Sequence, residues 1–355
     1  EEGKIYIQKR LQLLQPGEKG IEALIKEVGL IPQKLALATG YIKEIKPMSV
    51  EKYIHKLQEL KKQDKKGKGK LMLPEVSLGL ETLGLSSQLV MRYGTYLDPD
   101  FIPFALVSAL LGVSDEEELD TILAVLERLS LVKIINDPSK QGIQIHREIQ
   151  AACREYKNWE RKVKDEVAEQ FLVKSLLQTL IQCMPEIAKE PDATWTQAEL
   201  YATNVTRVLT SVSKMVAIYP LLAILSNRMA VYSKELACDY LVALSFHQQA
   251  LEIYQQMYKG KNHLDMAKLL SNIGMVYAEL GQCEEALKYS KQALAMVQTL
   301  YSGNHPEIAV SLNSLAWIYF DSNRPQEALK YSKQALEMGQ TLYSGNHPEI
   351  AMSLN

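Results

Sequence analysis

Cysteine, net charge and long apolar runs are all scarce in this chain of 355 residues. The four cysteines lie far apart and form no CxxC pair, which favours reduced thiols. The 40 lysines and arginines nearly balance the 42 aspartates and glutamates, so overall charge points to neither nucleic acid nor membrane as a partner. The longest apolar stretches, 104–113 and 215–225, are too short to cross a bilayer, and we recognise no signal peptide. We therefore expect a cytoplasmic protein.

The chain is organised around a repeat. Residues 285–313 and 327–355 agree at 26 of 29 positions with a shift of 42. Self-similarity at such a period is typical of a solenoid, in which each unit buries its apolar face against its neighbours. Apolar residues at helical spacing predict two helices in each unit, and Gly281 and Asn323 between them suit a left-handed helix end. Each unit is thus predicted to be a helix hairpin, and because the last one is cut short, we interpret the chain as a fragment.

The repeat resembles the tetratricopeptide repeat. The shared features are a small residue at the eighth position, tyrosine at the eleventh, and alanine at the twentieth and twenty-seventh: Gly274, Tyr277, Ala286 and Ala293, then Ala316, Tyr319, Ala328 and Ala335. The 42-residue period and the Gly-Asn-His-Pro-Glu linker resemble the kinesin-light-chain-like variety. One departure is serine at positions 290 and 332, where the family prefers an aromatic residue. We expect Tyr289 and Tyr331 to fill that space.

The first helices of tetratricopeptide arrays line a concave face, so the resemblance implies a protein or peptide partner there. Asn272, Asn313 and Trp317 lie on first helices and are the candidates to hydrogen-bond or stack on a peptide backbone. The alternative is that the two asparagines stabilise the superhelix itself.

Three histidines, His263, His305 and His347, recur at the repeat period. Stacked helix pairs would place successive copies about 10 Å apart, too far for one zinc ion. We therefore predict helix caps and no metal site.

Near the N-terminus, residues 18–45 carry two helical stripes separated by Gly29, which ends one helix, and Pro32, which starts the next. The segment 28–42, VGLIPQKLALATGYI, resembles the GLPL motif of the NB-ARC module in signal-transduction ATPases of the STAND class. The resemblance implies that Pro32 packs on the adenine of a bound nucleotide. The alternative is that Pro32 only starts a helix.

The six lysines in residues 61–70 lack interleaved aromatics and predict a solvated linker.

Residues 85–149 predict strands as well as helices, unlike the helical segments before them. Three predicted helices, 85–96, 101–111 and 116–130, precede a hairpin formed by 131–135 and 143–145, a pattern that indicates a winged helix. The third helix opens with acidic residues that phosphate would repel, so DNA recognition is the least favoured function. The hairpin ends at His146, in a segment that resembles the MHD motif of NB-ARC proteins. This implies that His146 contacts the phosphates of ADP, although Arg147 replaces the family's aspartate; a simply packed or exposed histidine is the alternative.

The predicted fold class is mainly α: a small helical domain and a winged helix with a short β wing, followed by a tetratricopeptide solenoid. The predicted domains are a helical domain of NB-ARC type (1–60), a Lys-rich linker (61–73), a winged helix (74–156), degenerate helical repeats (157–257) and tetratricopeptide repeats (258–355).

Two functions are consistent with these motifs. The preferred one is the regulatory part of a nucleotide-switched signal-transduction ATPase, in which partner binding shifts a closed ADP state toward an open, self-associating one. No GxxxxGK[ST] motif occurs, so we expect no enzyme activity from the chain alone; ADP or ATP with Mg would be held only by the intact parent. The alternative is an interaction scaffold without nucleotide dependence.

Overall fold

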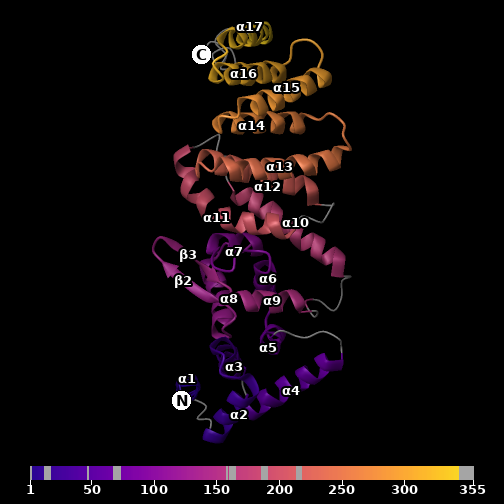
Figure 1. The fold of residues 1–355 in the computed structure, drawn as a ribbon. Coiled ribbons are helices and arrows are strands. Elements are labelled where there is room, and N and C mark those ends of the chain that lie inside the picture. The colour runs from indigo at the N-terminus through magenta and orange to yellow at the C-terminus, as the bar shows by residue number, and fades with distance from the viewer. Residues whose placement is uncertain are drawn as a thin grey trace. The chain divides into compact units, whose positions relative to one another are not determined.

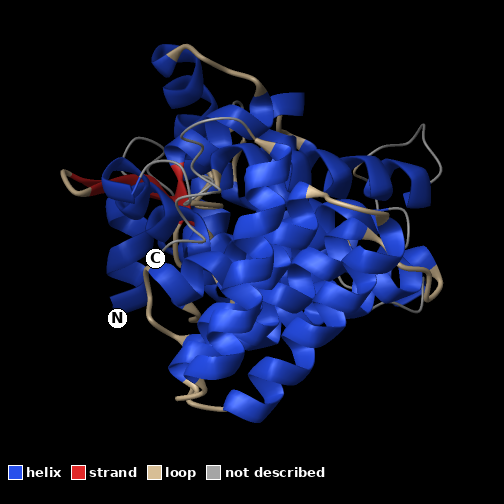
Figure 2. Cartoon of the chain, turned by 90° about the horizontal axis from the view of Figure 1, so that it is seen from above, coloured by secondary structure: helices blue, strands red, loops and turns tan. Residues whose placement is uncertain are grey.

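The computed structural model describes residues 2–11, 17–45, 48–66, 73–156, 159, 165–184, 191–212 and 218–343. Contacts divide the chain into two compact units, Glu1–Thr179 and Leu180–Asn355, which are taken separately below. Helices dominate both units, and the strands are confined to one small sheet in the described part of the first unit (Figures 1 and 2). The prediction of a mainly α chain is confirmed.

The first unit begins with five helices: α1 (Glu2–Arg10), α2 (Glu18–Val28), α3 (Pro32–Glu44), α4 (Val50–Lys66) and α5 (Pro74–Glu81). Gly29 ends α2 with a φ of 86°, a conformation that glycine adopts without steric cost, and Pro32 is the first residue of α3, as predicted. The Ser49 hydroxyl caps α4 by accepting a hydrogen bond from the Lys52 amide at 3.3 Å. Helix α4 runs through Lys66, into the segment expected to be a linker, because lysine favours helix and no glycine interrupts the run before that point.

Close backbone approach joins this helical region to helix α8 (Glu116–Arg128). A Cβ atom on Gly40 of α3 would lie 2.6 Å from the carbonyl oxygen of Arg128, the last residue of α8. Only a residue without a side chain fits there, so Gly40 allows α3 to pack directly on the end of α8.

The rest of the first unit combines α6 (Leu85–Gly94), α7 (Phe104–Leu111), α8 and α9 (Arg147–Glu155) with three strands, β1 (Ile102–Pro103), β2 (Lys133–Asp137) and β3 (Lys140–Gln144). The strand order is β1-β3-β2, and both pairings are antiparallel. The hairpin turn is tighter than the predicted 136–142, because an Asp137 carboxylate oxygen accepts a hydrogen bond from the Ser139 amide at 2.8 Å and lets Asp137 pair with Lys140. Strand β1 was not predicted, since two residues carry no periodicity.

The second unit is a stack of helices. Its described elements are the end of α10 (Asp165–Cys183), α11 (Pro191–Ser211), α12 (Tyr219–Glu235), α13 (Tyr240–Tyr258), α14 (Leu264–Glu279), α15 (Cys283–Leu300), α16 (Pro306–Asp321) and α17 (Pro325–Leu342). Helices pair as α12 with α13, α14 with α15 and α16 with α17, and each hairpin packs on the next (Figure 1). The predicted solenoid of helix hairpins is therefore confirmed. The boundaries of the five predicted domains stay predictions.

Small and aromatic residues hold each hairpin together. A Cβ atom on Gly274 would lie 2.3 Å from the Ser290 hydroxyl oxygen, so these two positions share a space too small for the aromatic residue that the family prefers. The ring of Tyr289 instead stacks on Tyr277 with centroids 5.3 Å apart. Tyr331 repeats the arrangement on Tyr319 in the next hairpin. Both tyrosines thus pack against a first-helix tyrosine, and whether they replace the family's aromatic residue in its own space stays a prediction.

All four cysteines are free thiols, and Cys153 is buried. Burial raises the pKa of the Cys153 thiol to about 12, so this group stays protonated and unreactive at neutral pH. No helix in the described ranges is long and apolar enough to cross a membrane.

Candidate functional site

Pro32 lies on an exposed apolar turn. It is the first residue of α3, and the two residues before it, Leu30 and Ile31, are 66% and 48% exposed. Rigid apolar groups that face solvent beside a helix N-terminus can pack against a planar ring. Whether Pro32 contacts a nucleotide stays a prediction.

His146 is the N-cap of α9. Its Nδ1 atom accepts a hydrogen bond from the Glu148 amide at 3.3 Å, and its side chain is exposed. Arg147, which stands where the resembled family has aspartate, forms an exposed ion pair with Asp100 at 3.1 Å. In this chain His146 therefore has a capping role, and its predicted contact with phosphate stays a prediction.

The two N-terminal candidates belong to different helices that share one neighbour. Helix α5 packs against both α3, which starts at Pro32, and α9, which His146 caps. In the described part of the first unit, no hydrogen bond or ion pair joins the two residues. Helix α5 is therefore the neighbour through which the two candidates are linked.

In the repeats, Asn272 connects two successive first helices. Its side-chain amide on α14 donates a hydrogen bond to the Asn227 side-chain oxygen on α12 at 3.5 Å. Asn313 on α16 is half-buried and also has an interaction partner. An ion pair of 2.8 Å between Lys268 and Glu307 further joins α14 to α16. For Asn272 this geometry favours the alternative role, the stabilisation of the superhelix.

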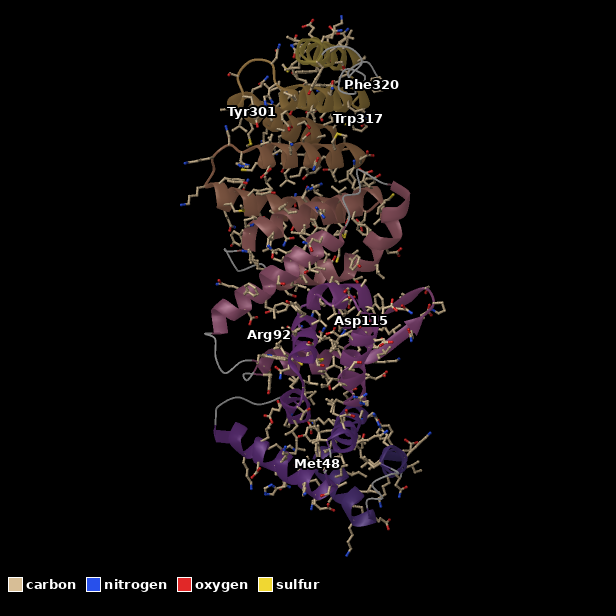
Figure 3. The ribbon with its side chains drawn as sticks, turned by 180° about the vertical axis from the view of Figure 1, so that it is seen from behind. Met48, Arg92, Asp115, Tyr301, Trp317 and Phe320 are labelled. Carbon is tan, nitrogen blue, oxygen red and sulfur yellow. The ribbon has the colours of Figure 1, made fainter. Side chains whose placement is uncertain are left out.

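Trp317 is the most accessible of the three candidates in the repeats, since Asn272 and Asn313 are half-buried. It is 42% exposed on α16, and Phe320, three residues later, is 71% exposed. Residues three apart in a helix share a face, and Figure 3 shows the two labelled side chains close together. We call Trp317 and Phe320 the aromatic pair. Sequence reasoning missed Phe320, although the signal was available: the corresponding residue one repeat earlier is Ala278, which is buried.

The repeating histidines are caps. Nδ1 of His263 accepts a hydrogen bond from the Asp265 amide, and Nδ1 of His305 accepts one from the Glu307 amide, both at 3.2 Å. The prediction of helix caps is confirmed for these two, whereas His347 lies outside the described residues. Over the ranges that the structure describes, no group of three potential ligands is arranged to hold a metal ion.

A comparison with protein-family models identifies the repeats. The tetratricopeptide repeat profile matches residues 221–299 and 265–341. No curated protein sequence matches the chain. Among solved structures, the chain is similar to BtubC (BKLC) from P. vanneervenii, with 17% identity and a TM-score of 0.33 over 68% of this chain and 92% of that one. It is also similar to a STAND protein with a tetratricopeptide repeat sensor from Pyrococcus horikoshii, with 14% identity and a TM-score of 0.34 over 91% of this chain and 49% of that one. The segment 221–341 of this chain consists of tetratricopeptide repeats, a type of repeat that serves as a protein-interaction scaffold.

Proposed function

We propose that the repeats bind a protein or peptide partner through the aromatic pair, Trp317 and Phe320. The observation that carries this proposal is the exposure of two large aromatic side chains on one face of a first helix. Buried aromatic anchors dominate the energy of protein interfaces, and covering one such side chain contributes about 2 kcal/mol.

The surroundings of the pair favour binding by a rigid surface. Helix α16 is held to α14 by the ion pair between Lys268 and Glu307, and Asn272 holds α14 to α12. Because α16 is also packed into the core of the repeats through Leu315 and Ile318, little ordering cost is left for the binding step. The expected partner places an apolar side chain against each ring.

A displayed library of random dodecapeptides, selected on the whole chain, tests this function. We expect the selected peptides to lose at least tenfold in affinity for the Trp317→Ala/Phe320→Ala variant. Leu241→Ala is the matched control, because Leu241 is 68% exposed but lies on a second helix, α13. Peptides that bind the double variant and the wild type equally well would place the interaction elsewhere.

We further infer that the N-terminal part belongs to a nucleotide-dependent switch. The proposal is supported by the GLPL-like segment at Pro32, the MHD-like segment at His146, and the order of three helices and a hairpin between them, which suits a winged helix. The exposed turn before Pro32 is available to a ring such as adenine. The phosphate cradle and the Mg ligands would come from elsewhere in the intact protein, since this chain has no P-loop motif. Partner binding at the repeats would then shift the balance between closed and open states.

To test the switch, the complete gene product is purified and its bound nucleotide is measured. We expect bound ADP in the wild type and its loss or faster exchange in His146→Ala. His263→Ala is the matched control, because it removes the same kind of helix cap within the repeats. Absence of nucleotide from the wild type would leave the interaction scaffold as the whole function.

A further inference from the structure

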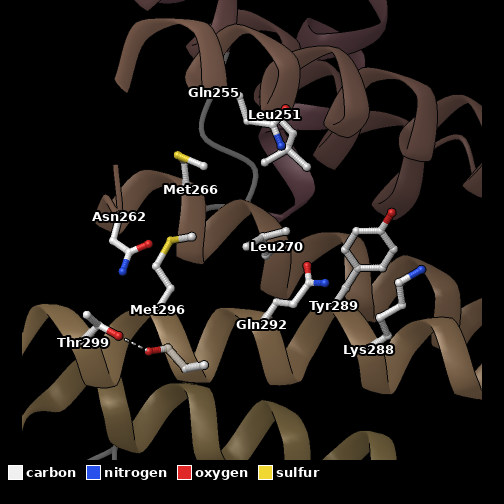
Figure 4. Close-up of a pocket in the computed structure, with 11 residues that line it drawn as sticks. Leu251, Gln255, Asn262, Met266, Leu270, Lys288, Tyr289, Gln292, Met296 and Thr299 are labelled. Atoms are coloured by element: carbon white, nitrogen blue, oxygen red, sulfur yellow. Dashed lines mark hydrogen bonds between the residues drawn. The ribbon is translucent and has the colours of Figure 1, made fainter. Parts of the chain in front are cut away.

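A groove runs between two second helices of the repeats, and neither residue of the aromatic pair lines it. Helices α13 and α15 form its walls and α14 its floor, and it encloses about 540 Å³ (Figure 4). Its lining consists of Leu251, Gln255, Asn262, Met266, Leu270, Lys288, Tyr289, Gln292, Ala295, Met296 and Thr299. The groove is thus part of the regular repeat structure.

The chemistry of the lining suits an extended chain segment. Met266 and Leu270 provide an apolar floor and Met296 adds an apolar side chain to the wall, and methionine adapts its shape to different side chains. Gln255, Asn262 and Gln292 add three primary amides, each of which offers both a donor and an acceptor. An extended backbone has unpaired N–H and C=O groups that such amides can satisfy, whereas a helix has already paired its own.

The length of the groove indicates how many residues of an extended chain segment fit into it. Figure 4 shows Lys288 and Tyr289 at one end and Asn262 and Thr299 at the other. On α15, Lys288 and Thr299 are separated by about 16 Å, at 1.5 Å per helical residue. An extended segment of about five residues covers that distance, at roughly 3.3 Å per residue.

The charge of the groove lining predicts the charge of the peptide that it binds. Lys288 is the single charged residue among those that line the groove, and it lies at one end. Its ion pair with Glu285, at 2.8 Å, is well exposed on both sides and therefore contributes little. The lining thus has one positive charge and no carboxylate of its own.

We propose that this groove binds an extended peptide of about five residues, with apolar side chains at alternate positions and a carboxylate placed at Lys288. The apolar side chains enter between Met266 and Met296, and the amides of Gln255 and Gln292 pair with the peptide backbone. Because side chains of an extended chain alternate, a carboxylate four residues beyond an apolar anchor lies on the same face and reaches the same groove.

The next repeat provides an internal comparison. Lys288, Tyr289, Gln292, Met296 and Thr299 recur as Lys330, Tyr331, Gln334, Met338 and Thr341. Ala295 of the groove wall is replaced by the exposed residue Glu337. A carboxylate at this position would repel an acidic peptide, so we expect the peptide to bind along α15 and not along α17.

The test uses the synthetic pentapeptide acetyl-Leu-Gln-Leu-Gln-Asp-amide, with a second peptide in which lysine replaces the aspartate. Binding to the whole chain is followed through the resonances of ¹³C-labelled methionine methyl groups. We expect the acidic peptide to shift the signals of Met266 and Met296 and to leave those of Met338 and Met229 in place. The lysine peptide should bind severalfold more weakly, as expected for the loss of one exposed ion pair.

Three variants complete the design. Ala295→Glu, which copies the residue found one repeat later and therefore suits the fold, should weaken binding at least tenfold. Lys288→Gln should also weaken it, whereas Lys330→Gln, the matched control, should not. The Trp317→Ala/Phe320→Ala variant should bind normally, which separates this groove from the aromatic pair. Unshifted Met266 and Met296 signals, equal binding of both peptides, or full affinity in Ala295→Glu would each overturn the proposal.

Discussion

The ring of Tyr301 lies flat on the imidazole of His305, with ring centroids 3.6 Å apart and planes inclined by 8°. The same imidazole caps α16 through Nδ1, which accepts a hydrogen bond from the Glu307 amide at 3.2 Å. Tyr258 and His263 repeat the arrangement before α14. The linker between repeats is therefore an ordered element, in which one histidine both caps a helix and packs against the end of the preceding one.

His305→Ala should destabilise the repeats by about 1 kcal/mol, because it removes both the cap and the stacked ring. His305→Asn should lose less, since asparagine is a good N-cap and keeps the hydrogen bond to the first turn. Amide hydrogen exchange over α16 measures the difference directly. Equal loss of protection in both variants would mean that the stacked ring, and not the cap, carries the stability.

Acid should weaken the second unit through His247. This residue is buried on α13, its Nδ1 has no hydrogen-bond partner, and burial together with Lys234 lowers the pKa of its side chain from 6.5 to about 4. The imidazole therefore binds a proton more readily in the unfolded chain than in the folded one. As a result, the folded state is most stable above pH 6.5, where the imidazole is neutral in both states, and it loses stability as the pH falls from 6.5 toward 4. At pH 5 the loss is about 2 kcal/mol relative to pH 8.

Urea unfolding at pH 8 and pH 5 tests this dependence in the wild type and in His247→Gln. The variant should lack the part of the pH dependence that belongs to the histidine, while carboxyl groups elsewhere contribute equally to both proteins. His263→Gln serves as the control, because His263 is partly exposed. The same pH dependence in His247→Gln and the wild type would show that the buried imidazole does not control acid stability.

Ser290→Ala should stabilise the second unit by about 1 kcal/mol. The Ser290 hydroxyl is buried without a hydrogen-bond partner, which costs free energy that a methyl group would not. Ser332→Ala, at the matching position of the next repeat, should change little because Ser332 is only half-buried. Thermal unfolding of the three proteins compares them, and a loss of stability in Ser290→Ala would reveal a partner for the hydroxyl.

Gly142→Ala should disrupt the small sheet and destabilise the first unit by about 2 kcal/mol. A Cβ atom on Gly142 would lie 2.4 Å from the carbonyl oxygen of Ile102, across the pairing of β3 with β1. Gly84→Ala is the control, since a Cβ atom at Gly84 would meet nothing within 4 Å. Hydrogen exchange of the β3 amides would report the effect, and unchanged protection in Gly142→Ala would contradict the expected crowding.

Much of the repeat could be predicted because its information is local. The stripes of apolar residues, the left-handed glycine at position 281 and the capping histidines all act within one hairpin, over contacts that are close in sequence. The same holds for the boundary between α2 and α3, where Gly29 and Pro32 act on their own helix ends. A periodic pattern of apolar residues predicts which face of a helix is buried, and glycine, proline and capping residues predict where the helix ends.

The surroundings of the candidate site residues could not be predicted, because they depend on contacts between residues that are far apart in the sequence. The sequence by itself determined the period of the repeat, its helices and their caps, because these arise from backbone preferences of neighbouring residues. The tertiary structure decided that Asn272 joins Asn227 of the preceding repeat, that Phe320 stands beside Trp317 in solvent, and that a two-residue strand pairs across Gly142. It also decided that second helices α13 and α15 stand apart over α14 to leave a groove. The physical reason is that burial, pairing and free volume at a residue depend on what packs against it from distant parts of the chain.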